Sequence, residues 1–128
     1  MGYMCHHAIV LTSWKEEAID EARHAALMLF PHRLVSPVLD SVANGYKTFL
    51  IAPDGSKEGW EPSNLGDCNR FAFVEWLRGN HVGCIKWVEV QYGDDSLVTK
   101  VVADSDEWAR EEEILKFMRQ VDPMKGRL

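Results

Sequence analysis

Cysteine is scarce in this sequence and lacks the spacings that would make it a structural or redox centre. The chain has three cysteines in 128 residues, an odd number, and no C-x-x-C pair. This argues against a disulfide framework and for a reducing, cytoplasmic environment. The sequence also has no run of about 18 apolar residues, so we expect no membrane-spanning helix. Its first residues have neither the basic region nor the apolar run of a signal peptide.

Clustered positive charge is also missing. The formal net charge is -6, and residues 104–113 alone hold six acidic residues and one arginine, so five of the six net negative charges lie in that segment. A solvated helix surface accounts for this acidity. Because no basic patch is available to displace counterions, binding to nucleic acid is disfavoured.

The motifs of the common catalytic and cofactor-binding classes are absent. His24 and His32 have neither an HExxH motif nor a histidine or cysteine partner at metal-ligand spacing, and the sequence has no GxSxG, no P-loop and no GxGxxG. The sequence therefore gives no reason to expect a metal or a cofactor, and it assigns no catalytic residue.

What the sequence does contain is the pattern of an α+β domain. The hydrophobic fraction is 46%, enough for a chain of this length to bury a core, and residues 1–128 are read as a single domain. Short β-branched and aromatic runs predict strands, and apolar residues at helical spacing predict three helices. The strands are expected at 6–12, 34–40, 46–52, 84–92 and 97–103, and the helices from 13 to Pro31, from 64 to 78, and from about 104 to before Pro123.

The order is therefore β-α-β-β-α-β-β-α. It predicts an antiparallel-dominated sheet of four or five strands with the first two helices on one face, a ferredoxin-like variant with an added hairpin strand. Asn44-Gly45 and residues 93–96 have the composition of tight turns. Pro37 cannot donate to a strand ladder, so the strand around it is expected at an edge or bulged.

Three finer expectations concern helix starts and covered surfaces. Ser13 and Glu16 form an S-x-x-E capping box, and Asn64 is a plausible N-cap of the second helix. Strand alternation sets Trp87, Glu89 and Gln91 against Val88 and Val90, and the first set is read as a partly open face that the third helix or a second subunit would cover. A homo-oligomer is expected for that reason. The expected buried side of the third helix comprises Ile114, Leu115, Met118 and Val121.

The stretch APDGSKEGW, residues 52–60, suggests a ligand site. Its turn is complete by Ser56, and the residues that follow precede a helix N-terminus, where free N–H groups favour an anion. Lys57 would add charge, Trp60 would offer a flat surface for a base, and Arg70 lies further along the same helix. The alternative is that Trp60 fastens the loop to the core and Lys57 pairs with nearby acids.

Two histidines and a tryptophan complete the candidate residues. His6 and His7 are neighbours on a strand, so they point to opposite faces, and sequence alone does not say which one faces the core. His7 is included among the ligand-binding candidates, together with Trp14 at the first turn of the first helix. Cys5 precedes His6, but a cysteine near a strand start is usually a small buried hydrophobe.

Three segments resemble those of a group of short bacteriophage proteins with no assigned activity. They are MCHHAIVLTSW (4–14), SPVLDSVANGYKTFLIAPDGSKEGW (36–60) and GDCNRFAFVEWLR with KWVEVQYGDD (66–78 and 86–95). By analogy with phage sponge proteins, the resemblance implies capture of a cyclic nucleotide or cyclic ADP-ribose immune signal in the host cytoplasm. It transfers no site residue.

The function expected from these observations is binding of a small nucleotide-derived ligand without cleavage. One alternative is an enzyme that degrades such a signal with His6 or His7 as acid or base. Another is an inhibitor that binds a host protein through the acidic third helix. Ligand stacking and oligomerisation explain the five tryptophans equally well.

Overall fold

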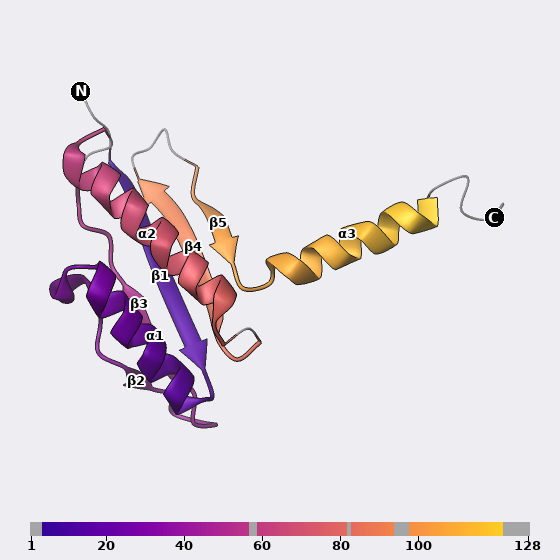
Figure 1. Ribbon diagram of the computed structural model, residues 1–128, viewed down its shortest axis with the longest axis horizontal. Helices are drawn as coiled ribbons and strands as arrows, with labels where there is room; N and C mark the ends of the chain where they lie inside the picture. Colours follow the sequence, from indigo (N-terminus) through magenta and orange to yellow (C-terminus); the bar gives the residue numbers. More distant parts are fainter. Residues whose placement is uncertain (1–3, 57–58, 82, 94–97, 122–128) are drawn as a thin grey trace.

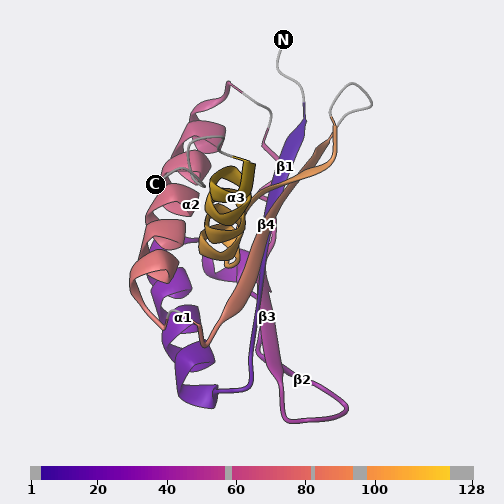
Figure 2. The same ribbon diagram turned by 90° about the vertical axis from the view of Figure 1, so that its right-hand side faces the viewer.

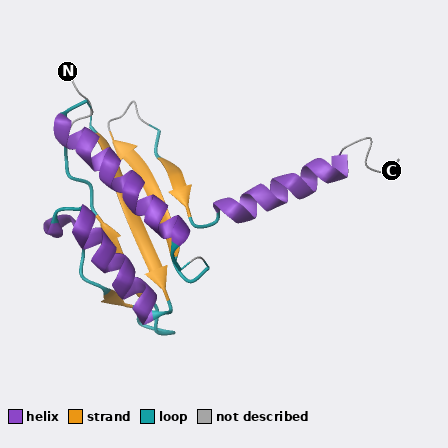
Figure 3. Cartoon of the chain, viewed as in Figure 1, coloured by secondary structure: helices purple, strands orange, loops and turns teal. Residues whose placement is uncertain are grey.

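A five-stranded antiparallel sheet with helices on one side forms the frame of the molecule (Figures 1 and 3). The structure is a computed structural model, and it describes residues 4–56, 59–81, 83–93 and 98–121. The strands run in the order β2-β3-β1-β4-β5, and every neighbouring pair is antiparallel. The elements are β1 (Cys5–Ser13), α1 (Glu16–Leu29), η1 (His32–Leu34), β2 (Leu39–Asp40), β3 (Lys47–Ile51), α2 (Glu61–Gly79), β4 (Lys86–Gly93), β5 (Lys100–Asp104) and α3 (Glu107–Val121).

The predicted α+β class and element order are therefore confirmed. The ferredoxin-like assignment stays a prediction. Pro37 precedes a strand of only two residues at the sheet edge, where a missing donor costs no ladder bond. Asn44 and Gly45 both have φ of 66°, the left-handed conformation that the predicted tight turn requires. Most of the predicted turn at 93–96 lies outside the described residues, but the strands on either side of it pair as expected.

β1 is the centre of the sheet because it pairs with both β3 and β4 along most of its length. Its odd-numbered residues point toward α1 and α2, which lie on the same side of the sheet (Figure 2). Ile9 and Leu11 are completely buried there, and Phe49 and Trp87 flank Leu11 in the register. Phe73 of α2 completes this core and packs edge-on against Phe30 at the end of α1.

The even-numbered residues of β1 face the other way. With their register partners they form the side of the sheet that no described helix covers (Figure 2). We call the apolar centre of this side the open face; its residues are Ala8, Val10, Leu50, Val88, Val90 and Val101. His6 and Tyr92 lie beyond it at one end of the same side, and Thr12, Thr48 and Lys86 lie beyond it at the other. The prediction that Trp87, Glu89 and Gln91 line the uncovered side is wrong. Trp87 pairs with Leu11 and is buried, so the valines of β4 are the uncovered set.

α3 extends away from the sheet and from the other two helices (Figure 1). Its first turn is fastened by Arg78 of α2, whose guanidinium donates to both carboxylate oxygens of Glu107 at 3.2 and 2.9 Å. The predicted buried side of this helix is wrong for Ile114, Leu115 and Met118, all of which are exposed. The spacing of the apolar residues correctly predicted a helix. Among the described residues, however, no other element packs against the apolar stripe of α3.

The helix starts also differ from expectation. Ser13 is a buried residue of β1, where its hydroxyl donates to the Cys84 carbonyl at 2.7 Å and accepts from the Lys15 N–H at 3.0 Å. The capping box is therefore wrong, and α1 begins at Glu16. α2 begins at Glu61, three residues before the predicted N-cap, because Pro62 suits the first turn of a helix.

Candidate functional site

His7 and Glu89 form a side-chain pair between the sheet and α2. Ile9 is the register partner of Glu89, so His7 lies diagonally across the strands from Glu89, within reach of its long side chain. The distance from His7 Nδ1 to Glu89 Oε2 is 3.2 Å, and the two side chains are only 15% and 12% exposed. A carboxylate only accepts hydrogen bonds, so Glu89 holds the imidazole with its proton on Nδ1. The structure thus places His7 on the core side and His6 on the uncovered side of the sheet, next to the open face.

Cys5 lies on the same strand as His7, two residues earlier and on the same face. Its Sγ is 3.5 Å from His7 Nε2. With the proton on Nδ1, Nε2 of a neutral imidazole is an acceptor, so it can take the proton of the thiol. Cys5, His7 and Glu89 therefore form a line of three groups, thiol to imidazole to carboxylate. Sequence reasoning placed Cys5 beside His6, but the side chains alternate and the thiol meets His7 instead.

Arg70 of α2 lies beside this line but is surrounded by carboxylates. Its Nε is 3.8 Å from Glu89 Oε2, and its Nη2 pairs with Asp67. Burial opposes ionisation of Asp54, but hydrogen bonds from Ser56 and the charge of Arg70 outweigh it and lower the pKa of the Asp54 carboxyl. Arg70 thus faces more negative charge than it carries, which weakens the expected attraction for a phosphate.

The same corner contains a small cavity of about 220 Å³. His7 and Arg70 line it together, with apolar walls from Phe30 and Leu65. Gly66 makes room for the ion pairs, since a Cβ there would lie 3.1 Å from Arg70 Nη1. Of the five expected ligand-binding residues, the structure thus brings His7 and Arg70 together.

The remaining three lie elsewhere or outside the described residues. Trp60 is the N-cap residue of α2 and is 51% exposed, but it does not line the cavity. Trp14 follows the far end of β1, about 23 Å along the strand from His7 at the usual rise per residue. Lys57 lies outside the described residues. Binding by these residues stays a prediction.

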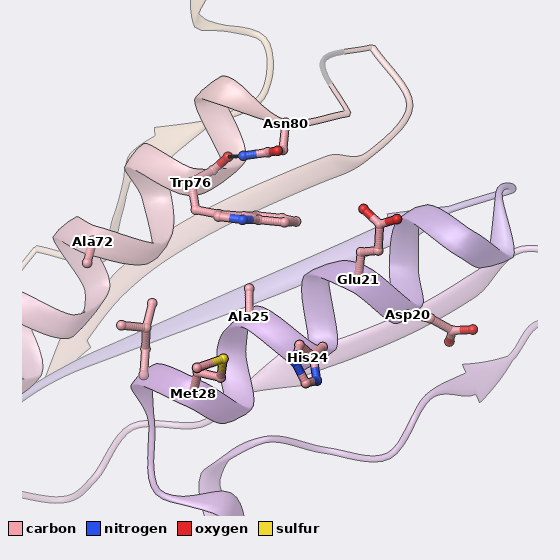
Figure 4. A pocket seen from close by; sticks show the side chains of 9 residues that line it. Asp20, Glu21, His24, Ala25, Met28, Ala72, Trp76 and Asn80 are labelled. Atoms are coloured by element: carbon pink, nitrogen blue, oxygen red, sulfur yellow. Dashed lines mark hydrogen bonds between the residues drawn. The ribbon is translucent and has the colours of Figure 1, made fainter.

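A second and larger hollow lies between α1 and α2 (Figure 4). This groove has a volume of about 730 Å³. Trp76 points from α2 into the gap between the helices, and Met28 and Ala25 come from the α1 side (Figure 4). One end is acidic, with Asp20 and Glu21. Glu21 is in turn fixed by His81, whose Nε2 lies 2.5 Å from its carboxylate.

Sequence analysis did not find this groove. Trp76 was counted only among the aromatic residues, and its neighbours Phe73 and Leu77 were read as the packed face of their helix. A signal was present, because Ala25, Met28 and Leu29 are an apolar set on α1 next to the stripe that faces the sheet. What sequence could not give is the spacing of two helices that are far apart in the chain.

The described residues offer no group of three histidine, cysteine, aspartate or glutamate side chains that could hold a metal ion. Nor does any helix in the described part of the chain have the length and apolar character needed to cross a bilayer. The chain matches no protein-family model, no curated protein and no solved structure. The described residues thus form an α+β protein with an open antiparallel sheet, an apolar groove between α1 and α2, and a thiol–imidazole–carboxylate line.

Proposed function

We propose that the protein binds and holds a small molecule in the groove between α1 and α2, without a chemical step there. The observation that carries this proposal is the groove itself, about 730 Å³ in volume and walled by Trp76 and Met28. Ligand sites of small molecules have volumes of about 300–1,000 Å³, mostly apolar walls and a few polar groups that set orientation. The groove has this composition, with Asn80 and the acidic end as its polar groups.

The charge of the groove narrows the ligand. Asp20 and Glu21 would repel a phosphate at that end, while an uncharged or cationic flat molecule would meet Trp76 and the carboxylates favourably. A nucleotide-derived signal, expected from the resemblance to phage proteins, would need its base against Trp76 and its phosphates directed away from the two acids. The proposal includes capture of such a signal in a host cytoplasm, provided that the signal binds in this orientation.

We also propose that two copies associate through their open faces. A two-fold axis brings the same surface of both copies together, so an apolar face is complementary to itself. The rim of the face supports this partner. Lys86 and Asp106 already pair at 2.7 Å within one copy, and Asp104 lies beside them, so opposite charges at this end can also meet across the axis.

Calorimetric titration with a panel of ligands tests the binding proposal. The panel contains nucleosides, cyclic nucleotides, cyclic ADP-ribose and cationic aromatic compounds. Two variants on α2 serve as a matched pair, because both replace an exposed apolar residue with arginine. Ala72→Arg fills the groove, and Leu65→Arg blocks the small cavity near His7 instead.

If the ligand binds in the groove, Ala72→Arg should lower the affinity at least 10-fold and Leu65→Arg should change it little. The reverse pattern would indicate that the ligand binds in the cavity lined by His7 and Arg70. If no member of the panel binds the wild type, the proposal fails for these ligand classes.

A further inference from the structure

We infer that Cys5 is the nucleophile of an acyl-transfer site, with His7 as its base and Glu89 as the group that orients the base. Thiol nucleophiles are recognised by this geometry, in which nucleophile and base are within hydrogen-bond reach and a third group fixes the base. Here the two contacts are 3.5 Å from Cys5 Sγ to His7 Nε2 and 3.2 Å from His7 Nδ1 to Glu89 Oε2. The site is separate from the groove and does not depend on it.

The fold, rather than a loop, holds the three groups in line. Cys5 and His7 share one face of β1 because they are two residues apart, and Glu89 comes from the neighbouring strand β4. Glu89 is held from the other side by Arg70, whose Nε is 3.8 Å from the same Oε2 that His7 contacts. Two cationic or proton-donating neighbours therefore keep this carboxylate in position for the imidazole.

The two other cysteines of the chain allow the reactivity of Cys5 to be compared within one protein. Cys68 is exposed on α2, and Cys84 is partly buried. Among the side-chain hydrogen bonds of the described residues, the sulfur that meets a histidine nitrogen is that of Cys5. If exposure decided thiol reactivity, Cys68 would react first. If proton transfer to His7 decides it, Cys5 would react first although it is less exposed, because the thiolate is the reactive form.

The reaction balances with groups already in the protein and water. Nε2 of His7 takes the Cys5 thiol proton, and the thiolate attacks the carbonyl carbon of an activated ester or thioester. The tetrahedral intermediate expels its leaving group, which takes the proton back from His7, and an S-acyl Cys5 remains. Water then gives a proton to Nε2 of His7 while its oxygen attacks the acyl carbon. The C–S bond breaks, the carboxylic acid leaves, and the Cys5 thiolate takes the proton back from His7. No oxidant, metal or cofactor enters these steps.

The surroundings favour a small acyl group. The base His7 lines the cavity of about 220 Å³, whose walls include Ile9, Phe30 and Leu65; Cys5 is not part of this lining and lies 3.5 Å from Nε2 of His7. That volume suits a short chain and not a whole nucleotide. The cavity also has carboxylates at its edge, from Asp54 here and from Asp67 and Glu89 around Arg70. An uncharged acyl substrate meets no repulsion from them, whereas an anionic one would.

The first experiment needs no variant. Wild-type protein is treated with iodoacetamide between pH 5.5 and 9, and the alkylated cysteines are quantified by peptide mass spectrometry, with Cys68 as the internal standard. We expect Cys5 to react at least 10-fold faster than Cys68 below pH 7, because an unassisted thiol is only a few per cent thiolate at neutral pH. Equal or slower reaction of Cys5 across the whole range would overturn the inference.

Two variants then separate the roles of base and orienting group. His7→Asn keeps a donor toward Glu89 and removes the Nε2 acceptor, and Glu89→Gln keeps the shape and removes the charge. In both variants, the alkylation rate of Cys5 below pH 7 should fall to about that of Cys68. The alkylation rate of Cys68 itself should stay unchanged. If His7→Asn folds normally and Cys5 keeps its low-pH reactivity, the imidazole is not the base. The charged groups that lie around His7, namely Glu89, Arg70, Asp54 and Asp67, are all retained in His7→Asn.

Transfer of an acyl group is tested with p-nitrophenyl acetate. The wild type should release nitrophenolate and carry one acetyl group on Cys5 in the intact mass spectrum, and Cys5→Ser should lose both signals. Acetylation spread over lysines and all three cysteines, with no difference between wild type and Cys5→Ser, would show ordinary surface chemistry and overturn the activity.

Discussion

The two faces of the sheet carry similar apolar residues but lie in opposite environments. On the covered face, Ile9 and Leu11 are fully buried beneath α1 and α2. On the open face, Ala8 and Val10 of the same strand are only partly buried, and Leu50 is 36% exposed. Both faces follow the alternation of a strand that has an apolar layer on each side. The difference teaches that the described residues complete one of these apolar layers and leave the other uncovered.

The strongest way to break this comparison is to remove the same side chain from each face. Leu11 is 0% exposed on the covered face, and Leu50 is 36% exposed on the open face of the neighbouring strand. We expect Leu11→Ala to lower the free energy of unfolding by about 2–5 kcal/mol, the range for a leucine that leaves a core cavity. At protein concentrations where the chain is a monomer, Leu50→Ala should cost less than about 1 kcal/mol, because much of its side chain meets water there.

Urea unfolding of both variants, followed by circular dichroism, gives the two values. The wild-type slope serves as the control for a two-state transition. A loss in Leu50→Ala that grows with protein concentration is the result expected if a second copy covers the open face. A loss as large as that of Leu11→Ala at every concentration would contradict the difference between the two faces.

The faces also show where sequence reasoning succeeds and where it stops. Alternation along β4 correctly separated Val88 and Val90 from Trp87 and Glu89, because strand geometry fixes which residues share a side. It could not say which side the helices cover. Trp87 and Glu89 looked suited to a partly open surface, but Trp87 fills the core next to Leu11. Covering is a tertiary property, decided by where α1 and α2 return to the sheet.

The candidate sites show the same limit at the level of single contacts. His7 was among the expected ligand-binding residues, a role that stays a prediction, and its contacts with Cys5 and Glu89 depend on the strand pairing, which the sequence does not state. Arg70 was expected to be available for a phosphate, and three carboxylates that converge on it change its role. Periodicity therefore gave the elements and most of their order, and the chemistry depends on contacts between distant segments.

A charge placed in the middle of the open face sharpens the comparison at the level of assembly. Val90 is paired with Ala8 on one side and Val101 on the other, so Val90→Lys puts a cation at the centre of the face. We expect the wild type to sediment at a multiple of 14.6 kDa and the variant to sediment at 14.6 kDa, because an unpaired buried charge opposes association.

Val42→Lys is the matched control, since Val42 is fully exposed in the turn between β2 and β3 and lies outside the open face. It should sediment like the wild type. A wild-type protein that stays at 14.6 kDa at high micromolar concentration would remove the second copy as the cover and leave the face to another partner.

The smallest expected effect concerns the charged rim of the open face, where Asp104 at the end of β5 pairs with Arg110 of α3 at 3.0 Å. The hydrogen bond from Arg110 lowers the pKa of the Asp104 carboxyl below its ordinary value of 3.8. The unfolded chain, with the higher pKa, therefore takes up a proton first as the pH falls. The stabilisation from Asp104 is complete above the unfolded pKa and is lost as the pH drops through the folded one.

The variant Asp104→Asn tests this dependence. In the wild type, Asp104 Oδ1 accepts a hydrogen bond from the Asp106 N–H at 2.8 Å. Asparagine keeps an oxygen acceptor for that bond and removes only the charge. The stability difference between wild type and Asp104→Asn should thus be constant between pH 5 and 7 and shrink below about pH 4, and Arg110→Gln should show the same pH-dependent loss. The difference should be small because water screens an ion pair at the surface. Thermal melts from pH 2.5 to 7 measure it, and parallel curves for wild type and Asp104→Asn down to the lowest pH would show that Arg110 does not stabilise this carboxylate.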